Sequence, residues 1–139
     1  MLNKLLLVVF STLVLSACNT INLENKYQKP ENLLYQNNKL AYKTITVQRD
    51  NKLCKDDTPD SQDCPISLYI NDFKAGDFYI NNTAKFHLKK DKYILKVKNC
   101  LNNCSNSEVK INLKEQLKNV TYILSVDHEQ KPIIIIKNI

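Results

Sequence analysis

The sequence predicts an all-β protein, a small antiparallel β-sandwich of about seven or eight short strands. Apolar runs recur at roughly ten-residue spacing with turn residues between them, which is typical of sandwiches and barrels. Several runs alternate apolar and polar residues, as a strand does when only one of its faces is buried. No long segment has the period of an amphipathic helix that would compete with this assignment.

The strands are expected to follow one another from residue 42 onward. Their predicted ranges are 42–48, 66–70, 75–80, 84–88, 93–98, 109–113, 120–126 and 133–136. Asn71-Asp72-Phe73-Lys74 is the first expected turn, because Asn and Asp tolerate the left-handed backbone of tight hairpins. Asn81-Asn82 is the second. Gly76 is the only glycine, and a glycine within a strand marks a bulge or a close backbone approach.

The last strand and two loops complete the expected domain. Four consecutive isoleucines, residues 133–136, suit a strand that is buried on both faces or covered by the N-terminal segment. As an exposed edge, the same run would promote aggregation. Residues 50–65 and residues 99–106 are rich in polar and turn-forming residues, and we expect both to be loops.

The N-terminal residues have the layout of an export signal. Lys4 precedes an apolar run, residues 5–15, and small residues follow it. The run is too short to cross a bilayer, which takes about 20 apolar residues. Leu15-Ser16-Ala17-Cys18 resembles the lipobox of bacterial lipoproteins. The resemblance implies cleavage before Cys18, a diacylglycerol thioether on this cysteine and a fatty acyl group such as palmitate on its amino group. The alternative is an ordinary signal peptide with a chance cysteine.

The same resemblance divides the chain and suggests its compartment. Residues 1–17 are the expected lipoprotein signal peptide, residues 18–40 the lipidated cysteine with a flexible tether, and residues 41–139 the β-sandwich domain. The tether is rich in Asn, Lys and Gln and could extend about 70 Å at ~3.4 Å per residue. Asn19 stands where inner-membrane lipoproteins of this kind usually carry Asp, which implies an outer-membrane anchor. Whether the periplasmic or the surface face carries the protein stays open.

Four cysteines remain besides the one in the lipobox: Cys54, Cys64, Cys100 and Cys104. An even number in an exported chain predicts disulfides, because that compartment is oxidising. Three connectivities are possible, and we favour the local pairs Cys54–Cys64 and Cys100–Cys104, since each pair flanks a polar loop. Each closure would remove about 2–3 kcal/mol of denatured-state entropy. Zinc is the alternative, but the spacings do not match its usual close pairs, so we expect no metal.

The charge of the chain constrains its partners. The formal net charge is +6, and lysine supplies nearly all of it, because Arg49 is the only arginine. Nucleic-acid sites favour arginine forks and clustered aromatic residues, so we expect no nucleic-acid partner. The simplest interpretation is a solvated lysine surface. The alternative is weak attraction to anionic lipid headgroups or polyanionic envelope glycans.

A second resemblance covers about residues 42–127. Residues 66–80 form a strand, a tight turn and a return through a small residue and glycine, and residues 85–97 run strand, turn, aromatic, strand. This pattern resembles the PEGA-like β modules of bacterial envelope proteins. It implies a small envelope β-sandwich without known catalytic residues. Asn71-Asp72 and Asp91 replace the usual turn glycines, and both substitutes tolerate positive φ.

Candidate catalytic residues are few. His87 lies on the polar phase of its strand and is interpreted as a surface histidine. His128 follows Asp127 after a strand, and no free cysteine remains to serve as its nucleophile. The serines lack a nucleophile-elbow setting, and no glycine-rich phosphate loop is present. Phe73, within a polar turn, should be exposed and is a candidate contact with a partner.

These observations favour a non-catalytic outer-membrane lipoprotein that acts as a binding or structural module. Its partner would be an envelope protein or glycan, contacted through strand edges and loop tips, with no cofactor. The second hypothesis is a phage-exclusion or immunity-type lipoprotein, which genetic neighbourhood would separate from the first. The weakest is a hydrolase that uses Asp127 and His128.

Overall fold

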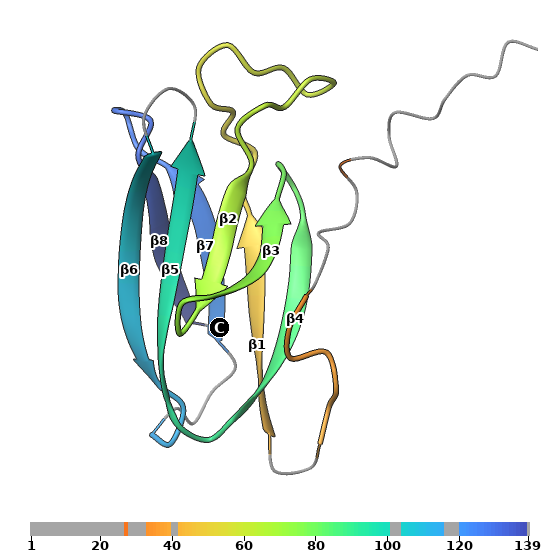
Figure 1. Cartoon of the computed structure of the whole chain (residues 1–139), viewed down its shortest axis with the longest axis vertical. Helices are drawn as coiled ribbons and strands as arrows, with labels where there is room; N and C mark the ends of the chain where they lie inside the picture. The colour runs from red at the N-terminus through yellow and green to blue at the C-terminus, as the bar shows by residue number, and fades with distance from the viewer. Residues whose placement is uncertain (1–26, 28–32, 40–41, 101–103, 116–119, 139) are drawn as a thin grey trace, which may run out of the picture.

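Two four-stranded sheets pack face to face in the computed structural model of the chain (Figure 1). The structure describes residues 27, 33–39, 42–100, 104–115 and 120–138. Within these residues the strands are β1 (Tyr42–Arg49), β2 (Ile66–Ile70), β3 (Phe73–Phe78), β4 (Thr83–Lys89), β5 (Lys92–Cys100), β6 (Cys104–Asn112), β7 (Val120–Val126) and β8 (Pro132–Asn138). The prediction of an all-β sandwich is confirmed.

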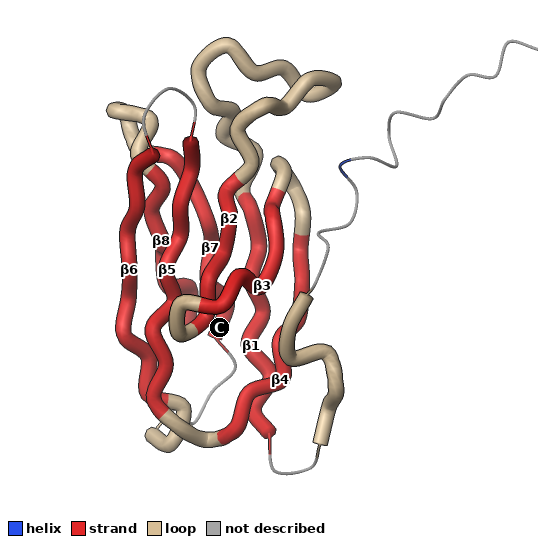
Figure 2. The backbone as a smooth tube through the Cα atoms, in the orientation of Figure 1, coloured by secondary structure: helices blue, strands red, loops and turns tan. Residues whose placement is uncertain are grey.

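The two sheets have the strand orders β4-β1-β7-β8 and β3-β2-β5-β6, and Figure 2 shows them as two red layers. Three hairpins, β2–β3, β5–β6 and β7–β8, stay within one sheet, while the other connections cross between sheets. One strand pair departs from the predicted antiparallel arrangement, because β1 and β7 pair in parallel. Long-range pairing of this kind leaves no local signal, because the two strands are far apart in sequence.

The core lies between the sheets and follows the period-two pattern of the strands. In β2, Ile66, Leu68 and Ile70 are fully buried, and the residues between them are half-buried. Phe78 of one sheet lies 6.4 Å from Phe86 of the other, measured between ring centroids. Burying such side chains stabilises the fold by about 1.5–3 kcal/mol each.

The first hairpin turn is shorter than expected. Asn71 and Asp72 have φ of 49° and 67°, which is the two-residue turn type that matches strand twist. Phe73 already pairs with Ile70 in the ladder, so the expected four-residue turn is wrong. Asp91 does not have a positive φ, unlike these two residues, although the resemblance to the β modules suggested that it would replace a glycine there.

Gly76 lies at a bulge in β3, as the sequence suggested. Leu68 pairs with Gly76 and Tyr69 with Lys74, so Ala75 is an extra residue on the bulged strand. The bulge leaves the ladder of β3 irregular, and the carbonyl oxygen of Ala75 accepts a hydrogen bond from the backbone of Leu33 at 2.9 Å.

The loop predicted at residues 99–106 is mostly strand. Asn99 pairs with Ser105, and Cys100 pairs with Cys104, so β5 and β6 continue to the ends of the hairpin. Asparagine-rich sequence favours turns, but here the cross-strand hydrogen bonds hold these residues extended. Residues 101–103 lie outside the described part of the chain.

The four isoleucines form an edge strand, which is neither of the buried arrangements that we favoured. Among the strands that the structure describes, β8 pairs with β7 alone. Ile134 packs against the core, whereas Ile135 and Ile136 are 44% and 48% exposed. Residues 33–39 of the N-terminal segment contact β3 and β4 instead of these isoleucines.

The described part of the expected tether lies against the sandwich. Leu33 donates its backbone N–H to Ala75 of edge strand β3, and the carbonyl oxygen of Tyr35 accepts from the N–H of His87 in edge strand β4, at 2.9 Å each. Because β3 and β4 belong to different sheets, residues 33–39 bridge two sheet edges. This part of the expected flexible tether is therefore docked on the domain.

Candidate functional site

The loops at one end of the sandwich form a densely hydrogen-bonded region, which we call the loop pole. It comprises the β1–β2 loop (50–65), the β3–β4 turn (79–82), the β7–β8 turn (127–131) and the adjoining ends of β5 and β6 (Figure 1). Except for Thr121, the buried polar residues of the described chain gather there: Arg49, Gln62, Asn82, Asn99 and Ser125. No buried side-chain nitrogen or oxygen among the described residues lacks a hydrogen-bond partner.

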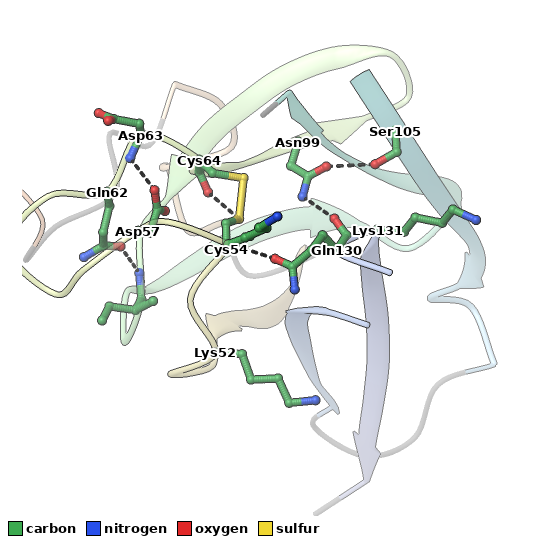
Figure 3. Close-up of a disulfide and its surroundings, with 12 residues drawn as sticks. Lys52, Cys54, Asp57, Gln62, Asp63, Cys64, Asn99, Ser105, Gln130 and Lys131 are labelled. Carbon is green, nitrogen blue, oxygen red and sulfur yellow. Dashed lines mark hydrogen bonds between the residues drawn. A yellow bond between two sulfur atoms is a disulfide. The ribbon is translucent and has the colours of Figure 1, made fainter. Parts of the chain in front are cut away.

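The disulfide Cys54–Cys64 closes the β1–β2 loop (Figure 3). Both cysteines are buried, at 4% and 5% exposure. Inside the loop, the carboxylate of Asp57 accepts from the N–H of Asp63 at 3.0 Å. The predicted pairing of these two cysteines is confirmed. The disulfide closes the base of the loop, and the hydrogen bond from Asp63 to Asp57 links its two sides.

Gln62 ties this loop to the β3–β4 turn. Its side-chain amide donates to the carbonyl oxygen of Pro59 at 3.0 Å, and its Oε1 accepts from the N–H of Ile80 at 2.9 Å. At 6% exposure, the amide is buried between the two segments. The loop is therefore fixed to a neighbour that is distant in sequence.

Gln130 joins three segments of the loop pole. Its side-chain Oε1 accepts from the N–H of Lys55 at 2.7 Å, and its carbonyl oxygen accepts from the side-chain amide of Asn99 at 2.9 Å (Figure 3). Asn99 in turn accepts from the hydroxyl of Ser105 at 2.8 Å. Gln130 has a φ of 65°, and in this backbone conformation its side-chain oxygen and its carbonyl oxygen both accept hydrogen bonds. Sequence reasoning missed this cluster because its members are far apart in the chain.

Arg49 caps the core beneath the loop pole. Its guanidinium group pairs with Asp50 and donates to the carbonyl oxygens of Leu124 and Lys52. Ser125 donates its hydroxyl to the same carboxylate of Asp50. Burial lowers the pKa of Arg49 from its ordinary value, and the neighbouring Asp50 opposes that shift. A single arginine at a strand end in a lysine-rich chain was the available sequence signal, since arginine suits buried, multidentate pairing.

Tyr27, from the expected tether, also docks at the loop pole. Its ring lies 4.6 Å from that of Tyr79, its carbonyl oxygen accepts from the side-chain amide of Asn82, and its hydroxyl oxygen accepts from the N–H of Gln62 at 3.4 Å. A tyrosine in a polar segment gave no sign of this role.

The opposite end of the sandwich carries a cluster of lysines, which we call the basic pole. It comprises the start of β1, the β4–β5 turn, the start of β5 and the end of β6, brought together by the pairs Tyr42–Lys89 and Lys92–Asn112. Its lysines are Lys39, Lys43, Lys89, Lys90, Lys92, Lys110 and Lys114, and its acidic residues are Asp91 and Glu115. The loop pole has the reverse balance, with Asp50, Asp56, Asp57, Asp60, Asp63, Asp127 and Glu129 against Arg49, Lys52, Lys55 and Lys131.

Lysines nearer the middle of the β3-β2-β5-β6 sheet are neutralised locally. Lys74 pairs with Asp77 at 2.8 Å, and Lys96 pairs with Asp72 at 2.5 Å. Lys74 and Asp77 both belong to β3, whereas Asp72 lies in the β2–β3 turn and reaches Lys96 of β5. At the basic pole, within the part of the chain that the structure describes, Lys114 has an ion-pair partner, Asp91 at 3.2 Å, and the other six lysines have none.

A groove of about 500 Å³ opens on the outer face of the sheet beside this pole. Its lining comes from the β2–β3 turn, β5 and β6: Asn71, Lys92, Tyr93, Ile94, Lys110, Ile111 and Asn112. The register pairs Ile94 with Lys110 and Lys92 with Asn112, so Ile94 has one lysine directly across the hairpin and another two residues earlier on its own strand. The sequence suggested scattered lysines, and the hairpin β5–β6 brings these together.

The remaining predicted site residues are the lipobox cysteine, the second cysteine pair and Phe73. Cys18 lies outside the described residues. Cys104 is in a disulfide, and its strand partner is Cys100; the side chain of Cys100 is not described, so the pairing Cys100–Cys104 stays a prediction. Phe73 is 67% exposed, as expected, but it is the first residue of β3 and not part of the turn.

The histidines lie in different settings. His87 is half-buried on the outer face of β4, with its Nδ1 2.9 Å from the hydroxyl of Thr44. His128 is 90% exposed and lies 3.8 Å from Glu129. Among the described residues, no group of three or more His, Cys, Asp or Glu side chains could hold a metal ion, and no helix is long and apolar enough to span a membrane.

No protein-family model, curated protein or solved structure matches the chain.

Proposed function

We propose that this chain is a lipid-anchored, non-catalytic binding module of the bacterial outer membrane, of the PEGA-like kind. The observation that carries the proposal is the sequence Leu15-Ser16-Ala17-Cys18 directly after a short apolar run. Asn19 is the residue that favours the outer membrane over the inner one. The partner would be an envelope protein or a glycan.

The disulfide and the loop pole support this proposal. A buried disulfide between Cys54 and Cys64 fits an oxidising compartment, which an exported domain would occupy. The loop pole holds its loops by side-chain hydrogen bonds and a disulfide. Binding proteins commonly present rigid loops of this kind on a β-sandwich. A binding surface on such a scaffold needs no catalytic group.

Membrane fractionation of cells that express the chain tests the proposal. The wild type should sediment with outer-membrane markers, and Cys18→Ala should leave that fraction because it has no thiol for the diacylglycerol. Asn19→Asp is the matched variant that keeps the thiol, and it should move the protein to the inner-membrane fraction. If Cys18→Ala stays with the outer membrane, the lipid anchor is wrong.

A further inference from the structure

The tether contacts place the two poles at different distances from the lipid anchor. If Cys18 carries the lipid, Tyr27 is nine positions further along the chain, and an extended chain of that length spans about 30 Å at most. Tyr27 contacts Tyr79, Asn82 and Gln62, all at the loop pole. The loop pole therefore stays within about 30 Å of the anchoring leaflet.

The basic pole lies a full strand length beyond the loop pole. β5 has nine residues, which span about 30 Å at ~3.3 Å per residue, and it runs from the basic pole to the loop pole (Figure 1). An anchor at the loop pole thus favours an orientation in which the lysines face away from the leaflet that holds the lipid. This geometry disfavours the headgroups of that leaflet as the partner of the lysines.

The charges of the basic pole are available to a ligand. Six of its seven lysines have no ion-pair partner among the described residues, whereas Lys74 and Lys96 on the same sheet are neutralised by Asp77 and Asp72. Like charges on one end of the molecule repel one another, and an anionic ligand would relieve that repulsion. The field of such a cluster attracts polyanions in particular.

The groove adds recognition to the charge. Ile94 lies next to both Lys92 and Lys110, and it offers an apolar surface to the face of a sugar ring. Asn71 accepts from the N–H of Ile94 at 2.9 Å through its Oδ1, which directs its amide NH₂ group away from that bond. A small number of placed polar groups around an apolar surface is the usual composition of a ligand site.

We propose that this groove and the surrounding basic pole bind an anionic glycan, a polymer whose sugar residues carry carboxylates or phosphates. Lys92 and Lys110 contact the acidic groups, and Ile94 contacts the ring between them. Asn71 and Asn112 donate to hydroxyl groups. This inference rests on the proposed envelope location for its choice of glycan over lipid, and the site itself rests on the geometry of β5 and β6.

Binding of fluorescently labelled polygalacturonate and phosphomannan to the mature protein in a non-ionic detergent tests the site, with dextran as the neutral probe. At least one anionic polymer should bind, dextran should not, and added salt should weaken binding. The one that binds identifies carboxylate or phosphate as the acidic group. Lys92→Gln with Lys110→Gln should weaken binding about tenfold, the effect of losing two exposed ion pairs.

The matched control is Lys52→Gln with Lys55→Gln, which removes the same charge from exposed lysines of the loop pole. It should change affinity less than about twofold. The inference is overturned if neither anionic polymer binds, or if both double variants lose affinity equally. It is also overturned if phosphatidylglycerol in mixed micelles displaces the glycan more effectively than unlabelled glycan does, since the partner would then be a lipid.

The assay distinguishes failure of this inference from failure of the anchor. If Cys18 carries no lipid, the soluble chain is tested with the same probes, and the site stands or falls on the Lys92 and Lys110 variants. Circular dichroism of both double variants checks that they are folded. Because all four lysines are exposed, we expect them to fold as the wild type does.

Discussion

The ring of Tyr27 packs against the ring of Tyr79 with 4.6 Å between centroids and an angle of 57° between planes. Fifty-two residues of sequence separate the two tyrosines, and the contact fixes where the N-terminal segment meets the sandwich. Aromatic pairs of this kind contribute about 0.5–1.5 kcal/mol beyond their buried area. If the proposed lipid anchor is present, this contact would hold the loop pole near the leaflet.

The orientation can be measured in nanodiscs that contain paramagnetic headgroups. The amide signal of Asp60, in the loop pole, should be broadened more than that of Lys90, in the basic pole. Tyr27→Ala should reduce this difference, because the segment loses its ring contact, whereas Tyr69→Ala, on the outer face of β2, should leave it unchanged. Equal or stronger broadening of Lys90 in the wild type would contradict the proposed orientation.

Removal of the disulfide should destabilise the domain. Cys54→Ala with Cys64→Ala opens a loop whose ends are 10 residues apart in sequence, and the chain-entropy model predicts a loss of about 2–3 kcal/mol. Urea unfolding at neutral pH measures this loss. Reductant should lower the unfolding free energy of the wild type toward that of the variant. A change below about 0.5 kcal/mol would mean that the loop is held by its hydrogen bonds alone.

Asn99 is the buried link between the β5–β6 hairpin and the β7–β8 turn. Asn99→Ala removes its bonds to Gln130 and Ser105 and leaves their polar groups unpaired, so it should cost about 1–3 kcal/mol of unfolding free energy. Asn106→Ala, at an exposed position of β6, is the matched control and should cost less than about 0.5 kcal/mol. Chemical denaturation measures both losses. If the two variants lost equal unfolding free energy, Asn99 would not link the two segments.

Asp127 makes the stability of the β7–β8 turn depend on pH. Hydrogen bonds from the backbone N–H of Lys131 and then Glu129 lower the pKa of Asp127 below its ordinary value. A depressed folded-state pKa contributes stability that is present above the unfolded value, near 3.8, and lost as pH falls through the folded value. Asp127→Asn should therefore lower Tm at pH 7 and match the wild type near pH 2.

Thermal unfolding from pH 7 to pH 2 gives the comparison. Asp60→Asn, at the exposed tip of the disulfide loop, is the control, and its Tm should follow the wild type throughout. A difference between Asp127→Asn and the wild type that persisted at pH 2 would have to come from something other than the carboxylate charge.

Local patterns in the sequence were sufficient to predict most strands. The alternation of apolar and polar residues predicted the bounds of β1, β2 and β7 to within a few residues. The Asn71-Asp72 pair indicated a hairpin, because both residues adopt positive φ. The pairing Cys54–Cys64 was predicted because the two cysteines flank a loop between two strands that are consecutive in the sequence. Each of these features depends on residues that are close in the chain.

Features that depend on distant residues were missed. The parallel pairing of β1 with β7 joins segments many residues apart, and so does the docking of Tyr27. The edge position of the isoleucine strand depends on the order of strands in the whole sheet. The basic pole is a similar case, because its lysines come from four strand ends and the sequence shows only their total charge. Tertiary topology brings these residues together, and no local period records it.

Intact mass spectrometry of protein purified from membranes tests the lipid anchor most directly, with and without reduction and alkylation. The expected mass is that of residues 18–139 plus one diacylglycerol and one acyl group, with four thiols that become alkylated only after reduction. A mass without lipid, together with thiols that are free before reduction, would contradict both the anchor and the oxidising compartment.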